Sequence, residues 1–248
     1  YERLKNEMSE PVFAQEILAE FRDLTRGKVY LNFSKENIVK ENPFAAQVEV
    51  AKYLPIIVSM DFNLNPMCWV LGQFYKKTFY FFKEFYLENS NTQDASIKLI
   101  EYLNKLRERK LIQAEPNLII TGDPAGKAGQ RAAAGQSDYD IVLNYLRTHR
   151  YSYDFRVPDS HPAVKDRVNA VNAALKNFNG EKKLFIHESM LKTIKDFERV
   201  VWKSNQSMID KTNPQLTHLS DAIGYCVSEL MPVQSVSIGD SKLRVIIR

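Results

Sequence analysis

The chain has 248 residues, 44% hydrophobic and 26% charged, which is long enough for one large domain with a sizeable core. Its net charge of +4 is compatible with a polyanionic partner but does not require one. Cys68 and Cys226 are isolated in apolar surroundings, which argues against a zinc site or a disulfide framework. We therefore expect the protein to reside in a reducing cytosol. No apolar run reaches the roughly 18 to 20 residues that span a bilayer, and no signal peptide opens the chain, so we expect no membrane contact.

The first half of the chain predicts a connecting segment followed by strands. Residues 1–50 mix charged with scattered apolar residues, and we interpret them as a linker. Residues 55–60 predict a short apolar strand, and the runs MCWVLGQFYK and TFYFFKEFYL predict two more, which meet at Lys76-Lys77. We expect these three strands to be successive and antiparallel. Apolar residues at helical spacing then predict an amphipathic helix at 92–110.

The second half alternates strands with helices. We predict a strand at 117–121, a Gly- and Ala-rich loop to about 137, a helix at 138–149, a strand at 153–157, a helix at 164–178, a strand at 183–187, a helix capped by Ser189 with Val201 on its apolar face, and a helix at 218–230. This order predicts an α/β domain over residues 51–231. Its mixed sheet has three antiparallel strands first and parallel strands after them, flanked by helices. Residues 232–248 form a tail, with a hairpin around Gly239-Asp240.

Three aspartates each end or begin a buried-looking element. Asp61 follows the first apolar strand, Asp123 follows the fourth, and Asp221 lies in the first turn of the last helix. If the first and fourth strands are neighbours, Asp61 and Asp123 meet at one sheet edge, and a helix packed across that edge can place Asp221 opposite them. Such carboxylates repel one another unless a cation neutralises them. Two Mg²⁺ or Mn²⁺ ions about 4 Å apart could then activate a water and stabilise a leaving oxygen.

This pattern indicates phosphodiester cleavage, although each aspartate alone also fits ordinary turn or helix-start chemistry. Basic residues that could contact backbone phosphates lie nearby in the sequence. Lys127 and Arg131 follow Asp123 in its loop, and Lys165 and Arg167 open a later helix. Solvated surface charge is an equally good interpretation of these four residues.

Two further features bear on the chemistry. The loop GDPAGKAG is not an ATP-binding P-loop, because three residues rather than four separate its first two glycines and Ala128 follows the lysine. His218 lies three residues before Asp221, on a similar helix face, from which it could donate to that carboxylate or to a phosphate. A helix-start histidine without a role is the alternative.

Taken together, MDFN, ITGDPAG, VKDRVNAVNAAL and HLSDAIGY resemble, in order and spacing, the nuclease domain of the large terminase subunit of tailed bacteriophages and prophages. The resemblance covers most of the chain. It implies a ribonuclease H-like fold in which Asp61, Asp123 and Asp221 are the catalytic metal ligands. It also implies a metal-dependent endonuclease that cuts concatemeric viral DNA during genome packaging. Arg167 matches a basic position that we place near DNA.

The resemblance further implies partners and a setting. The partners are double-stranded DNA and, in a full-length protein, an ATPase domain, the small terminase subunit and the portal, in the cytoplasm of a bacterial host. A phosphate-binding loop is missing and the chain opens at Tyr1, so we expect an isolated nuclease domain with a linker remnant. Two alternatives stay open: another ribonuclease H-like enzyme such as a junction resolvase, and a non-catalytic module that docks on DNA or the portal.

Overall fold

A seven-stranded mixed sheet lies at the centre of the protein, whose computed structural model describes residues 2–17, 27–44, 48–129, 135–203 and 208–232. The strand order is β1-β7-β4-β3-β2-β5-β6. The strands are β1 (Ile38–Val39), β2 (Ile56–Asp61), β3 (Met67–Tyr75), β4 (Thr78–Leu87), β5 (Asn117–Gly122), β6 (Ser152–Phe155) and β7 (Leu184–His187). Only the β2–β3 and β3–β4 pairs of this described sheet are antiparallel, which confirms the predicted mixed sheet with its antiparallel opening.

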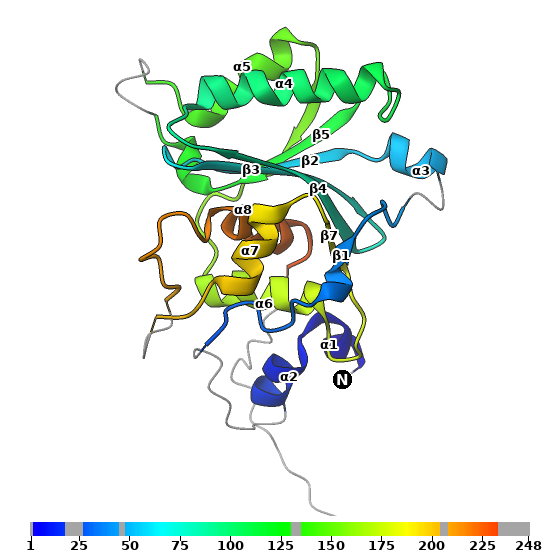
Figure 1. Cartoon of the computed structure of the whole chain (residues 1–248), viewed down its shortest axis with the longest axis vertical. Coiled ribbons are helices and arrows are strands. Elements are labelled where there is room, and N and C mark those ends of the chain that lie inside the picture. Colours follow the sequence, from blue (N-terminus) through cyan, green and yellow to red (C-terminus); the bar gives the residue numbers. More distant parts are fainter. Residues whose placement is uncertain (1, 18–26, 45–47, 130–134, 204–207, 233–248) are drawn as a thin grey trace, which may run out of the picture.

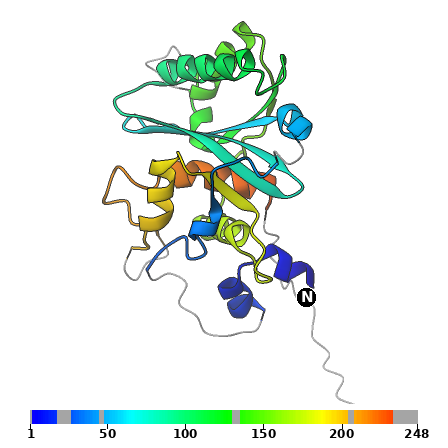
Figure 2. The same ribbon diagram turned by 45° about the vertical axis from the view of Figure 1, so that its right-hand side comes forward.

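Helices cover both faces of this sheet, and the two views in Figure 1 and Figure 2 agree on their sides. One face carries α4 (Thr92–Glu108) and α5 (Asp138–Thr148), and the other carries α6 (Val164–Leu175), α7 (Leu191–Arg199) and α8 (His218–Leu230). Every residue of β2 is buried, because this central strand contacts a separate apolar core on each face.

Alternation along β2 decides which face each of its side chains meets. Ile57 belongs to the core on the α6 and α8 side. The Ser59 hydroxyl donates to the backbone carbonyl of Ala222 in α8, at 2.6 Å. Asp61 is the next residue on that side, so the end of β2 presents its carboxylate to the beginning of α8.

The first 50 residues, which we interpreted as a linker, contribute a strand to the sheet. They contain α1 (Glu2–Glu7), α2 (Glu10–Glu16), the short 3-10 helix η1 (Lys35–Asn37), β1 and the beginning of α3 (Val48–Tyr53). Strand β1 pairs in parallel with β7 at the sheet edge. The side-chain amide of Asn37 donates to the carbonyls of Leu175 and Leu184, at 2.9 and 3.0 Å, and so fixes this segment to α6 and β7.

Some predicted boundaries differ from those in the structure. Helix α7 begins after Met190 rather than with Ser189 as its cap, and the Ser189 hydroxyl instead contacts Nδ1 of His187 at 2.7 Å. Val201 lies beyond the end of α7 and pairs with Lys28 in an isolated bridge. The hairpin predicted at residues 239–240 falls outside the described residues. In the part of the chain that the structure describes, no helix is long and apolar enough to cross a membrane.

Candidate active site

Asp61 and Asp123 lie side by side because β2 and β5 are neighbouring parallel strands. Met60 is opposite Gly122 in the register, and the Asp123 amide donates to the Met60 carbonyl at 2.8 Å. Gly122 has a φ of +138°, and a Cβ there would lie 2.2 Å from the Met60 carbonyl oxygen. Glycine is therefore required at position 122 for β5 to approach β2 this closely. The predicted meeting of the two strand ends is confirmed.

The Asp61 carboxylate is buried and only 4% exposed. Its Oδ2 accepts a hydrogen bond from Nδ2 of Asn63 at 2.7 Å and contacts Nδ1 of His218 at 3.0 Å. Burial raises the pKa of Asp61, and the charges of Asp221 and Asp123 raise it further, while His218 acts in the opposite direction. A cation bound close to Asp61 would therefore stabilise the ionised form of this carboxylate.

His218 contacts Asp61 rather than the predicted Asp221. Its Nε2 also lies 3.1 Å from the carbonyl oxygen of Pro214, so the ring is held from both nitrogens. Burial alone would lower the pKa of His218, but the hydrogen bond and the charge of Asp61 outweigh it and raise this pKa. The difference from the prediction arises because β2 ends against the first turn of α8.

Asp221 is equally buried, at 3% exposed, but it has two cationic partners. Arg167 donates to its Oδ1 at 2.8 Å and Lys211 donates to its Oδ2 at 2.9 Å. The Arg167 guanidinium also lies 4.3 Å from the centre of the Tyr225 ring. A Cβ at Gly224 would lie 2.9 Å from Cγ of Arg167, so this glycine leaves room for the arginine against α8. The protein itself thus neutralises Asp221.

Asp123 caps the short 3-10 helix η3 (Pro124–Lys127), its side chain accepting from the Ala125 amide at 2.8 Å. Nδ1 of His161 lies 3.4 Å from Oδ1 of Asp123 and 3.3 Å from the Tyr225 hydroxyl. Sequence reasoning missed His161, since no spacing pattern links it to either residue. Its contact with Asp123 depends on how the loop before α6 packs.

The three carboxylates are close enough to influence one another, as the pKa of Asp61 indicates, but they do not form the expected shared site. Among the described residues, no three Asp, Glu, His or Cys side chains gather closely enough to hold a metal ion. In addition, Arg167 and Lys211 each donate to one oxygen of Asp221.

Asp61 and Asp123 differ from Asp221 in having an oxygen open to a further ligand. Within the described ranges, the donors contact Oδ2 of Asp61 and Oδ1 of Asp123, which leaves the other oxygen of each carboxylate without a partner. Carboxylate oxygens are the ligands that Mg²⁺ and Mn²⁺ prefer. This donor set therefore fits such an ion.

The residues expected to contact DNA differ in position. Lys127 pairs with Asp159 at 2.8 Å, and Lys165 is exposed in the first turn of α6. Arg131 lies outside the described residues. Arg167 is 5% exposed and bound to Asp221, so it cannot face a DNA strand as we expected. Its charge is used within the protein, because a buried carboxylate without a partner is unfavourable.

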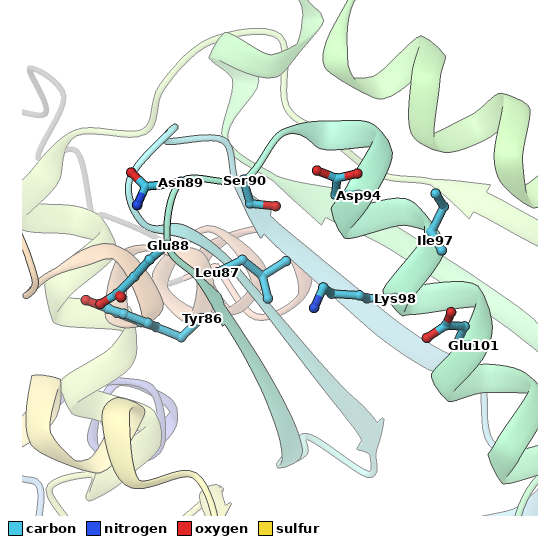
Figure 3. Close-up of a pocket in the computed structure, with 9 residues that line it drawn as sticks. All are labelled: Tyr86, Leu87, Glu88, Asn89, Ser90, Asp94, Ile97, Lys98 and Glu101. Carbon is cyan, nitrogen blue, oxygen red and sulfur yellow. The ribbon is translucent and has the colours of Figure 1, made fainter.

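Two hollows flank this edge of the sheet. The basic hollow, of about 590 Å³, lies between the beginning of α6, α8 and the segment at 208–212. It is lined by His161, Pro162, Val164, Arg167, Lys203, Met208, Ile209, Asp210, Lys211, Thr212 and Tyr225. The acidic hollow, of about 580 Å³, lies where β4 ends and α4 begins, as Figure 3 shows. It is lined by Tyr86, Leu87, Glu88, Asn89, Ser90, Asp94, Ile97, Lys98 and Glu101.

Comparison with solved structures finds this fold in phage large terminases. The large terminase of a thermophilic bacteriophage, solved in complex with ATP-gamma-S, is 20% identical and aligns with a TM-score of 0.62 over 92% of this chain and 51% of that one. The nuclease domain of the P22 large terminase is 14% identical, with a TM-score of 0.52 over 84% of this chain and 93% of that one. The chain therefore spans about half the length of the first of these proteins. No family model matches the sequence, and no curated protein does.

Proposed function

We propose that this chain, which has the fold of a large-terminase nuclease domain, is a metal-dependent DNA endonuclease that cuts concatemeric viral DNA during genome packaging. The observation that carries the proposal is the position of Asp61 and Asp123. They end adjacent parallel strands of this fold and lie side by side at its carboxyl edge. The raised pKa of the buried Asp61 adds support, because a bound cation would offset the cost of its charge.

In this proposal Asp61, Asp123 and Asp221 would hold two divalent ions, Mg²⁺ or Mn²⁺, once the three carboxylates come closer together than they are in this structure. Ions bound there would supply positive charge to the phosphate oxygens at the cleaved bond. His218 orients Asp61 through its hydrogen bond to Oδ2. Arg167 orients Asp221, whereas Lys211, whose side chain is 59% exposed, must release Oδ2 of Asp221 before that oxygen can bind an ion.

The wider setting is also a proposal. The substrate is double-stranded DNA, and Lys127, Arg131 and Lys165 contact its backbone phosphates. Within a longer protein the domain follows an ATPase domain and works with a small terminase subunit and a portal in the bacterial cytoplasm. The likeness to about half of the thermophilic phage's large terminase supports this arrangement.

The test is nicking and linearisation of supercoiled plasmid with Mn²⁺, Mg²⁺ or EDTA. We expect the parent protein to cut with a divalent ion and not in EDTA. Asp61→Ala and Asp221→Ala should each abolish cutting while retaining a cooperative thermal transition. An inert parent, or variants that cut as fast as the parent, would contradict the proposal.

A non-catalytic module that docks on DNA or the portal is the second candidate. It is favoured by one observation, the neutralisation of Asp221 by Arg167 and Lys211, which would give this carboxylate a structural role in such a module. Such a module would bind DNA with a strong salt dependence and would not cut it, with or without Asp61. Preferential cutting of branched over linear DNA would instead indicate a junction resolvase of the same fold.

A further inference from the structure

We propose that the basic hollow binds one deoxynucleotide of an unpaired DNA strand, with the base against its apolar wall and the phosphate at Lys203 and Lys211. The inference rests on the proposed function, because it assigns part of the DNA substrate to the same site. It goes further in requiring that a base leaves the double helix next to the carboxylates.

The position of the hollow connects it to two carboxylates of the site. Arg167 and Lys211 both line it and both donate to Asp221. His161 lines it as well and lies 3.4 Å from Asp123. A group bound in the hollow is therefore separated from Asp221 and Asp123 by a single side chain, which places it next to the proposed cleavage position.

The wall of the hollow is apolar and partly open to solvent. Pro162, Val164, Met208, Ile209 and Tyr225 contribute to it, and Val164 and Met208 are 38% and 60% exposed. A phosphate alone gains nothing from such carbon surfaces, whereas a nucleobase removed from the stack binds apolar and aromatic side chains. The volume of about 590 Å³ lies in the range of pockets that hold small ligands.

The charges on the rim favour a phosphate. Lys203 and Lys211 lie at the hollow with one acidic lining residue, Asp210, whose Oδ1 accepts from the Thr212 amide at 2.9 Å, while the charge of Arg167 is matched by Asp221. Within the described part of the chain, Lys203 interacts electrostatically with Asp210 but forms no close ion pair, so its ammonium group can still approach a phosphate. Lys211 is 59% exposed at its side chain and can contact a phosphate while it remains next to Asp221. The combination of an apolar wall and a cationic rim matches a nucleotide better than an acidic peptide, which would not need the apolar wall.

The acidic hollow supplies the internal control. It has nearly the same volume, but Glu88, Asp94 and Glu101 line it with only Lys98 to oppose them among its lining residues. Figure 3 shows that Glu88 comes from the turn after β4, and that Asp94, Lys98 and Glu101 come from α4. Like charges exclude a phosphate from this hollow, so a nucleotide should distinguish the two.

The experiment measures binding of dAMP, deoxyadenosine and inorganic phosphate to the whole chain by calorimetry in EDTA at low salt. We expect dAMP to bind at least about tenfold more tightly than inorganic phosphate or deoxyadenosine, since only dAMP uses both wall and rim. Lys203→Ala and Met208→Asp should each weaken dAMP binding by about tenfold. Lys98→Ala, in the acidic hollow, should leave it unchanged.

Val164→Asp is a second variant of the wall, at the first position of α6, where an acidic residue is compatible with the helix. It should weaken dAMP binding as Met208→Asp does. Equal affinities for dAMP and inorganic phosphate, or unchanged binding in the Lys203 and Met208 variants, would overturn the inference. Because EDTA removes the metal, dAMP binding can fail while plasmid cutting persists, and cutting can fail while binding persists, so the two proposals are tested separately.

Discussion

The two hollows at the carboxyl edge of the sheet are alike in volume, about 590 and 580 Å³, and opposite in chemistry. Glu88, Asp94 and Glu101 of the acidic hollow are exposed, whereas Asp221, which pairs with two residues of the basic hollow, is buried. Exposed carboxylates are solvated and need no partner, but buried ones require hydrogen bonds or counter-ions. The difference shows that the buried carboxylate of Asp221 has to be matched by cations within the fold, whereas the exposed carboxylates of the acidic hollow do not.

The sharpest test of this difference removes one negative charge from each region. Asp61→Asn should reduce DNA cutting by at least about 100-fold, because a metal ligand is worth several kcal/mol of transition-state stabilisation. Glu101→Gln should leave the rate unchanged. Plasmid cleavage rates with Mn²⁺ check both.

The free energy of unfolding of Asp61→Asn and Glu101→Gln distinguishes a loss of catalysis from a loss of folding. Asn at position 61 retains one acceptor oxygen for Asn63 and His218, so the free energy of unfolding in EDTA should change by less than about 1.5 kcal/mol. Equal cutting by the two variants would remove the distinction between the two regions.

The next effect concerns the buried ion pair. Arg167→Ala leaves Asp221 buried with Lys211 alone and should destabilise the protein by roughly 3 kcal/mol or more. Lys98→Ala in the acidic hollow removes an exposed cation and should change stability by less than about 0.5 kcal/mol. Urea unfolding followed by tryptophan fluorescence measures both. A loss below about 1 kcal/mol for Arg167→Ala would mean that Lys211 alone is sufficient for Asp221.

Burial should also make stability depend on pH on the α8 side. Asp196 in α7 is 3% exposed and accepts from the Ser220 amide at 3.2 Å, and burial raises its pKa to about 7. A raised folded-state pKa gives stability that is present below the unfolded pKa and lost as the pH rises through about 7. We therefore expect the melting temperature to fall from pH 5 to pH 8.

Asp196→Asn retains an acceptor oxygen for the Ser220 amide but cannot ionise, so its melting temperature should fall less over this range. Asp94→Asn, at an exposed position of the acidic hollow, should follow the parent protein. Melting curves for the three proteins at pH 5, 6, 7 and 8 decide the matter. Parallel profiles for the parent and Asp196→Asn would assign the pH dependence to other groups.

The smallest expected effect concerns the competition for Asp221. Lys211→Ala frees Oδ2 of Asp221 and should tighten Mn²⁺ binding by about fivefold, the scale of a partly exposed ion pair. Lys203→Ala removes the same charge from the same hollow without breaking an ion pair to Asp221. It should have a smaller effect. Titration of Mn²⁺ by electron paramagnetic resonance measures both affinities, and weaker binding in Lys211→Ala would show that the lysine supports the metal site.

Much of the fold could be predicted because its signals are local. The apolar and aromatic runs of β2, β3 and β4 and the helical spacing of α4 depend on neighbours in sequence. The edge that holds Asp61 and Asp123 was predictable as well, since parallel neighbours end on the same side of a sheet. Cap positions were less certain, as Ser189 illustrates, because one residue decides where a helix begins.

The sequence by itself determined the mixed sheet and the placement of aspartates at the ends of β2 and β5 and the start of α8. Only the tertiary structure decided the partners: Asp61 with His218, Asp123 with His161, and Asp221 with Arg167 and Lys211. The physical reason is the distance along the chain over which each kind of interaction acts. Hydrophobic periodicity acts within an element, whereas ion pairs between α6, α8 and distant loops depend on packing that brings together residues far apart in the chain, and charge alone does not specify which cation meets which carboxylate.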